Sequence, residues 1–263
     1  MPSNYLVQPS AAIDTIIFDL DDTLINWGTQ SITWPEYLAP MLASVVRFLG
    51  EKGHEVDGEK FGRRFGRNVR NAWAEARAKK TWEAVHMSGV AQTTLNDFGI
   101  DPATISVREL LEAFAWYPMP GVGPFPDTHA VLDTLRAMGY KIGLITNAYQ
   151  PMWMRDVEIE TFGLMDRLDA RITSGDTGFM KPHPAIYWRM LGLLNSTPER
   201  AMFVGDSPPN DIAGANRTGL TSVQVKPPHL DKKPTQDIEI ADHTITTLSE
   251  LLPLLKDLAD PQT

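Results

Sequence analysis

The 263-residue sequence contains no cysteine. Disulfide bonds and metal sites built from thiolates are therefore excluded. Long apolar runs are also missing, because no stretch approaches the roughly 18 residues that a membrane-spanning helix needs. The N-terminal segment MPSNYLVQPSAA lacks the basic stretch and apolar centre of a signal peptide. We therefore expect a cytoplasmic protein with no membrane partner.

Positive charge is scarce as well. The chain has 24 Lys and Arg against 33 Asp and Glu, which gives a formal net charge of -9. Nucleic-acid binding requires clustered basic surface, so no nucleic-acid partner is expected. A small anionic ligand is still allowed, because a local pocket can be positive on an acidic protein. The apolar content of 43% and the charged content of 22% are those of an ordinary globular protein of one or two domains.

Short apolar runs recur along the chain and alternate with helical patterns. The predicted strands are 15–18, 141–145, 170–173, 201–204 and 222–225. Helices are predicted between them over 127–138, 184–194 and 211–217, and a last helix over 248–258. This alternation is typical of a parallel sheet with helices on both faces, so the sequence predicts an α/β fold.

Residues from about 27 to 119 interrupt the alternation. Helices are predicted there over 35–49, 58–79, 81–98 and 106–115, with no convincing strand. The Gly/Pro-rich segment GVGPFP then joins this insert back to the alternating part. We therefore predict a core domain made of residues 1–26 and 120–263, and a helical domain over 27–119.

The first predicted strand ends in FDLDDTL, which places Asp19, Asp21 and Asp22 within four residues. Carboxylates this close repel one another, and burial strengthens the repulsion. Either these acids face water in a turn, or a positive charge lies among them.

The other predicted strands end in polar residues too. Thr146 and Asn147 end the second strand, Lys181 follows the third, and Asp206 and Asp211 follow the fourth. Ligands of open parallel sheets bind beyond the carboxyl ends of the strands, so these side chains are expected at one edge. Aspartate oxygens fit Mg²⁺, while a hydroxyl and an ammonium suit phosphoryl oxygens. An EF-hand loop, a P-loop, a complete dinucleotide fingerprint and a zinc motif all fail to match.

The polar segments resemble the four motifs of the haloacid dehalogenase-like hydrolases, in the expected order: FDLDDTL, ITNA, KPHPAIY and GDSPPND. The helical insert between the first and second is similar to the C1 caps of that family. The resemblance covers residues 14 to 225, approximately. It implies a Rossmann-like parallel sheet under a mobile, all-helical cap.

The resemblance also implies roles for individual residues. Asp19 would be the nucleophile that forms an aspartyl-phosphate, and Asp21 the general acid and then the general base. Thr146 and Asn147 would bind the substrate, and Lys181 would offset the charge of nucleophile and phosphate.

The metal implied by the resemblance is Mg²⁺. Its ligands would be the Asp19 carboxylate, the backbone carbonyl of Asp21 and the Asp206 carboxylate. Asp211 would orient Lys181 or a metal-bound water.

The predicted function is therefore an Mg²⁺-dependent phosphatase that acts on a small phosphorylated metabolite. Family members that displace halide from carbon lack an acid at the position of Asp21, since a halide leaves without a proton and an alkoxide does not. Phosphoryl transfer is thus favoured, with a 2-haloacid dehalogenase and a sugar-phosphate mutase as alternatives. A non-catalytic binding protein would be expected to lack Asp19 or Asp21. The sequence fixes neither the substrate nor the oligomeric state.

The predicted helix over 58–79 carries Arg63, Arg67, Arg70 and Arg77 on one face. A solvated basic face over the core of the insert is the favoured interpretation. The alternative is that one or two of these arginines reach the cleft and bind an anionic part of the substrate.

Overall fold

The computed structural model describes residues 13–259, so the segment MPSNYLVQPSAA and the prediction made for it lie outside the described residues. Within 13–259, six parallel strands form one sheet in the order β5-β4-β1-β6-β7-β8. Their bounds are Thr15–Phe18 (β1), Lys141–Thr146 (β4), Ala170–Thr173 (β5), Ala201–Gly205 (β6), Thr221–Val225 (β7) and His243–Ile245 (β8). The predicted α/β fold is confirmed.

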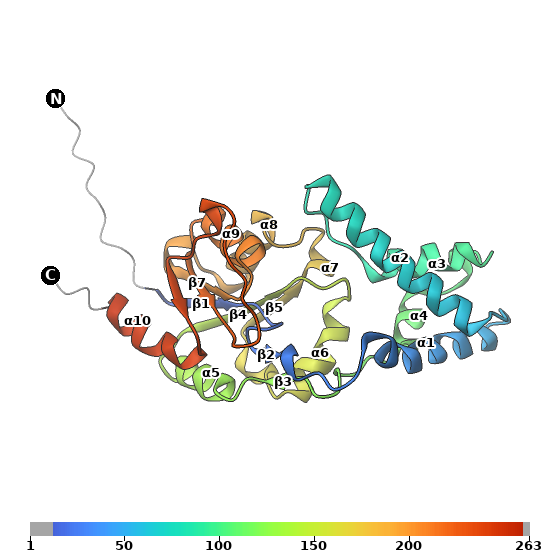
Figure 1. Ribbon diagram of the computed structural model, residues 1–263, viewed down its shortest axis with the longest axis horizontal. Helices are drawn as coiled ribbons and strands as arrows, with labels where there is room; N and C mark the ends of the chain where they lie inside the picture. The colour runs from blue at the N-terminus through green and yellow to red at the C-terminus, as the bar shows by residue number, and fades with distance from the viewer. Residues whose placement is uncertain (1–12, 260–263) are drawn as a thin grey trace, which may run out of the picture.

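Helices cover both faces of this sheet (Figure 1). Along β1, Ile17 points to one face, and its neighbours Ile16 and Phe18 point to the other, as the two-residue period of a strand requires. The Ile17 face packs against α8 (Pro184–Leu194) and α9 (Ala213–Thr218). The opposite face packs against α5 (Thr128–Ala137), α6 (Met152–Thr161) and α10 (Leu251–Ala259). Burial of β1 on both sides explains its uninterrupted apolar sequence.

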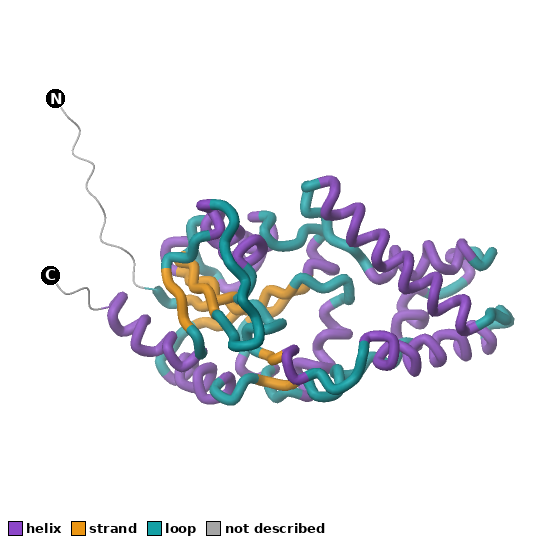
Figure 2. The backbone as a smooth tube through the Cα atoms, viewed as in Figure 1, coloured by secondary structure: helices purple, strands orange, loops and turns teal. Residues whose placement is uncertain are grey.

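A helical unit lies between the short antiparallel strands β2 (Ile25–Asn26) and β3 (Gly123–Pro124). Its helices are α1 (Trp34–Glu51), α2 (Gly58–Lys79), α3 (Met87–Asp97) and α4 (Val107–Ala113). Figure 2 shows these helices to one side of the molecule and the strands of the sheet to the other. Thr33 and Glu36 form a reciprocal capping box at the start of α1, which explains why the helix begins there.

Several predicted bounds need correction. The helix predicted over 81–98 begins at Met87, and the preceding residues run beside the 178–180 segment of the core. The Ala84 N–H donates to the Gly178 carbonyl at 3.0 Å, and the Met180 N–H donates to the Trp82 carbonyl at 2.8 Å. Backbone pairing with the core therefore replaces the first turn that the helical pattern predicts.

Other elements were not predicted. Strand β8 lies between the last predicted strand and the last predicted helix, where no element was predicted. Helix α6 and the one-turn α7 (Ser174–Thr177) follow strand ends without a clear apolar stripe. A strand of three residues carries too little periodicity to be distinguished from loop. No helix among the described residues is long and apolar enough to span a membrane.

A tyrosine packed against glycine fixes the loop that follows β6. The Tyr187 hydroxyl from α8 donates to the backbone carbonyls of Asn210 and Asp211, at 2.9 and 3.1 Å. Gly214 makes room for this ring, since a Cβ there would lie 2.2 Å from the tyrosine oxygen. The single π-helical turn Pro208–Ile212 is thereby held against α8.

Gly214→Ala is expected to destabilise the protein by about 1–3 kcal/mol, because the added methyl must displace the Tyr187 ring. Gly50→Ala is the control, since nothing lies within 4 Å of a Cβ at that helical position. That change should leave stability unaltered or raise it by less than about 1 kcal/mol. Urea unfolding measures both variants, and equal midpoints would contradict the packing argument.

Candidate active site

Three neighbouring strands deliver their polar residues to one edge of the sheet. Asp19 follows β1, Thr146 ends β4 and Asp206 follows β6. The register pairs Phe18 with both Leu144 and Val204, so the residues beyond these positions emerge side by side. Strands β4 and β5 lie on one side of β1, and strands β6, β7 and β8 lie on the other. Open α/β sheets bind ligands in the crevice beyond the strand ends where the strand order reverses in this way.

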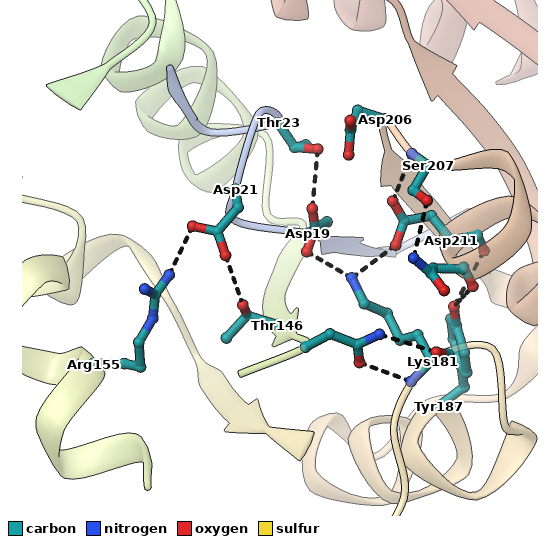
Figure 3. A network of polar contacts seen from close by, with 12 residues as sticks. Asp19, Asp21, Thr23, Thr146, Arg155, Lys181, Tyr187, Asp206, Ser207 and Asp211 are labelled. Atoms are coloured by element: carbon teal, nitrogen blue, oxygen red, sulfur yellow. Dashed lines mark hydrogen bonds and ion pairs between the residues drawn. The ribbon is translucent and has the colours of Figure 1, made fainter. Parts of the chain in front are cut away.

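Lys181 brings its ammonium group to this edge from the loop before α8. Its Nζ lies 2.6 Å from Asp19 Oδ1 and 2.7 Å from Asp211 Oδ1, and all three side chains are buried (Figure 3). The two carboxylates hold the pKa of Lys181 above its usual value although burial opposes this. Lys181 is therefore a fixed positive charge beside Asp19.

Asn147 holds the main chain of Lys181 at both polar atoms. Its side-chain oxygen accepts from the Lys181 N–H at 2.8 Å, and its side-chain nitrogen donates to the Lys181 carbonyl at 2.9 Å. The sequence predicts that Asn147 binds substrate. In this structure its amide positions the lysine, and the role in substrate binding stays a prediction.

Asp19, Asp206 and Asp211 form a buried acidic cluster, with one oxygen from each lying within 4.8 Å of the others. Burial raises the pKa of Asp19 to about 7, partly offset by Lys181. Burial and the charge of Asp19 raise the pKa of Asp206 to about 6, although Lys232 contacts Asp206 and opposes the shift. These carboxylates thus need additional positive charge to be ionised together at neutral pH. Three hard oxygen donors in this condition fit Mg²⁺.

The Asp21 carboxylate turns away from that cluster (Figure 3). Its Oδ1 accepts from Arg155 Nη2 at 2.9 Å and from Trp27 Nε1 at 2.7 Å, and its Oδ2 accepts from the Thr146 hydroxyl at 3.2 Å. Burial alone would raise the pKa of Asp21, but Arg155 and these hydrogen bonds lower it. In this arrangement Asp21 is an anion, and Thr146 bonds to Asp21.

Arg155 is itself buried and lies between two carboxylates. Its Nη1 contacts Glu158 at 2.8 Å, and Glu158 accepts a 2.7 Å hydrogen bond from Trp116 Nε1. The order Asp21, Arg155, Glu158 therefore alternates in charge from the site into the interior. Burial raises the pKa of Glu158, and Arg155 opposes that shift.

Sequence reasoning did not identify Arg155, Glu158 and Lys232 as site residues. Arg155 and Glu158 lie on one face of α6, three residues apart, and this spacing was the available signal. Lys232 comes from the tail after 226, which folds back over the cluster. Long loops give no periodic pattern that would indicate such a return.

The model of the haloacid dehalogenase-like hydrolases matches residues 13–219. The chain therefore belongs to this family, as its motifs predict. The glyceraldehyde 3-phosphate phosphatase of Methanopyrus kandleri is 30% identical over 167 residues, which are 63% of this chain and 70% of that protein.

Comparison with solved structures also finds members of this family. A HAD phosphatase from Thermococcus onnurineus matches with a TM-score of 0.60 and 26% identity, over 92% of this chain and 98% of that one. A 2-haloacid dehalogenase from Pseudomonas syringae pv. Tomato DC3000 matches with a TM-score of 0.61 and 25% identity, over 93% and 98%. The family and its phosphatase relative support the predicted class, a phosphoric monoester hydrolase.

Arg155→Met is expected to destabilise the protein by about 3–5 kcal/mol, because it leaves Glu158 buried without a cation. The double variant Arg155→Met/Glu158→Gln should recover a large part of this loss, since a glutamine oxygen can still accept from Trp116. Arg136→Met is the control: its ion pair with Asp169 is exposed and should be worth less than about 1 kcal/mol. Denaturant unfolding of the set decides, and a single Arg155 variant as mild as the control would refute the buried-pair account.

Proposed function

We propose that this protein is an Mg²⁺-dependent phosphatase that hydrolyses a small phosphorylated metabolite through an aspartyl-phosphate. The observation that carries the proposal is the buried Lys181 ammonium between Asp19 and Asp211, with Asp206 beside them at the carboxyl edge of the sheet. The phosphatase relative supports the reaction class. We also propose that residues 27–119 act as a cap over a core of 1–26 and 120–263.

In the proposed reaction, Asp19 attacks phosphorus, a P–O bond to the carboxylate forms, and the P–O bond to the alcohol breaks. Lys181 offsets the charge on the nucleophile and the phosphoryl oxygens, and Thr146 donates to one of these oxygens once it is released from Asp21. Water then attacks the aspartyl-phosphate and regenerates the Asp19 carboxylate. Asp19, Asp206 and the backbone carbonyl of Asp21 would hold Mg²⁺, which supplies charge neutralisation to the transferring group when bound.

Asp21 has two tasks in this scheme, and its surroundings favour one of them. As an anion bonded to Arg155 it is suited to accept the proton of the attacking water. Protonating the leaving alkoxide requires a protonated Asp21, and Arg155 disfavours that form. We infer that Asp21 turns from Arg155 towards Asp19 before the first step, and that this rotation frees Thr146.

Asp21 disfavours the dehalogenase alternative. A halide leaves without a proton, so a dehalogenase would not need an acid at this position, whereas an alkoxide leaving group does. The likeness to a 2-haloacid dehalogenase lies in the fold, which the two reactions share. A mutase would use the same aspartyl-phosphate, and net release of phosphate distinguishes it.

Asp19→Asn is expected to abolish phosphate release, with a loss of at least about 10³-fold, because the amide cannot form the acyl-phosphate. The assay measures release from p-nitrophenyl phosphate and a panel of phosphorylated metabolites, with Mg²⁺ and with EDTA. Asp14→Asn is the matched control. Asp14 lies at the start of β1, whereas Asp19 follows its end, and Asp14 pairs with Arg200 away from the site. Release that survives in Asp19→Asn would overturn the nucleophile assignment.

Mg²⁺ is expected to stabilise the wild-type protein. At 100 times the dissociation constant a ligand of the native state adds about 2.7 kcal/mol, which corresponds to a rise in Tm of roughly 5–10 °C. Asp206→Asn should lose most of this rise and Asp14→Asn should keep it, as measured by thermal unfolding with Mg²⁺ or EDTA. An equal rise in all three proteins would place the metal elsewhere.

A further inference from the structure

A second cavity lies directly beside the catalytic residues. It has a volume of about 440 Å³, and its lining comes from the helical unit and from the core: Trp73, Ala76, Arg77, Lys80, Trp82, Asn147, Met180, Lys181 and Asn210. Asn147, Lys181 and Asn210 also line the smaller cavity around Asp19, Asp206 and Asp211. The two cavities therefore adjoin along these three residues.

The two cavities differ in charge. Aspartates dominate the smaller one, whereas the described residues around the larger one include Arg77, Lys80 and Lys181 and no carboxylate. The neighbouring Lys79 is paired with Glu75, but within residues 13–259 no ion pair engages Arg77 or Lys80. A positive cavity on a chain of net charge -9 is a local feature that suits an anionic ligand.

Two tryptophans, Trp73 and Trp82, stand beside these cations in the wall that the helical unit contributes. The Arg77 guanidinium lies 5.9 Å from the centre of the Trp73 ring, and Arg217 of the core lies 5.3 Å from that of Trp82. Stacking of this kind holds a guanidinium while its N–H groups stay free to donate. Arg77 is thus held beside a ring, and no carboxylate among the described residues pairs with it.

The backbone around Trp82 is unusual. Trp82 has a φ of 51°, a left-handed conformation that a bulky side chain rarely adopts. The Trp82 carbonyl accepts from the Met180 N–H, and the Ala84 N–H donates to the Gly178 carbonyl, so the segment is fixed beside Lys181. Strained backbone that is held by its surroundings is concentrated at ligand sites, which is consistent with a binding wall here.

We propose that this cavity binds the alcohol part of the substrate, and that the alcohol part carries a second anionic group, a carboxylate or a further phosphate. Arg77 and Lys80 pair with that group, while Trp73 and Trp82 contact the carbon chain between it and the ester. The phosphoryl group to be cleaved lies at Lys181, where the two cavities meet. This assignment rests on the proposed phosphatase function and narrows its substrate class.

One of the four arginines predicted on the face of α2 is thereby singled out. Arg77 lines the cavity next to Lys181, whereas Arg63, Arg67 and Arg70 line a groove whose walls come from α1 and α2. Arg63 lies on the same stripe as Arg77, two heptads earlier and about 21 Å along the helix axis. Arg63→Gln is therefore a matched control for Arg77→Gln.

The test compares pairs of esters that differ in the second anion. The pairs are 3-phosphoglycerate with glycerol 3-phosphate, for a carboxylate, and fructose 1,6-bisphosphate with fructose 6-phosphate, for a phosphate. In at least one pair, the wild-type protein should prefer the ester that carries the second anionic group. We expect its kcat/KM to be higher by about tenfold or more, chiefly through a lower KM. The pair that shows the preference identifies which anion the cavity accepts.

Arg77→Gln should lower that preference to near unity, Lys80→Gln should lower it by a smaller factor, and Arg63→Gln should keep it. Circular dichroism and Tm of each variant show that the fold is intact, which is expected because these side chains are exposed. Equal kcat/KM within both pairs for the wild type, or a preference that survives in Arg77→Gln, would overturn the proposal.

A binding measurement separates this proposal from the phosphatase function. Isothermal titration of Asp19→Asn with the same esters and Mg²⁺ reports the anion preference without turnover. The esters with the second anionic group should bind more tightly than their partners to Asp19→Asn, and this difference should be lost in Asp19→Asn/Arg77→Gln. That result would support the subsite even if the wild type released no phosphate. Turnover by the wild type without anion preference would reject the subsite and leave the phosphatase function standing.

Discussion

The buried ammonium of Lys181 is the constraint on which the site depends. Asp19 and Asp211 are buried, and without a cation they would repel each other and become protonated. An isolated lysine would be equally costly to bury. Together the three groups offset one another's burial cost. The pKa of Asp19 is still raised, so its ionised form needs one more positive charge nearby. A divalent cation at this edge would supply that charge.

The supports of that ammonium come from several parts of the chain. Asn147, beyond the end of β4, holds the main chain of Lys181 by two hydrogen bonds, and Tyr187 of α8 holds the turn that carries Asp211. Because β4 and β6 lie on either side of β1, these supports converge on Asp19 without a long loop. The precision of the arrangement thus derives from the sheet.

The residues at the strand ends could be predicted from the sequence, because apolar runs mark the strands and the parallel topology brings their carboxyl ends together. Asp19, Thr146 and Asp206 gather for that reason, and Lys181 reaches them from the loop before α8. The spacing of Arg155 and Glu158 was a signal for that pair only. The contact of Arg155 with Asp21 could not be predicted, since the two residues are far apart in the sequence and a charged residue in a helix resembles a solvated one. The direction in which Asp21 points was equally inaccessible, because it depends on Arg155 and Trp27.

The segment before α3 shows why local pattern was insufficient in the helical unit. Its sequence is compatible with helix, yet its backbone groups bond to the 178–180 segment, and Trp82 adopts a left-handed conformation there. Local helix propensity is weak compared with the two backbone hydrogen bonds that the segment makes to the core. The same bonds carry Trp82 to within the lining of a cavity that contains Lys181. In the assignment we propose, residues of the 73–82 region would contact the alcohol part of the substrate, and they could change while the Asp19–Lys181–Asp211 set is preserved.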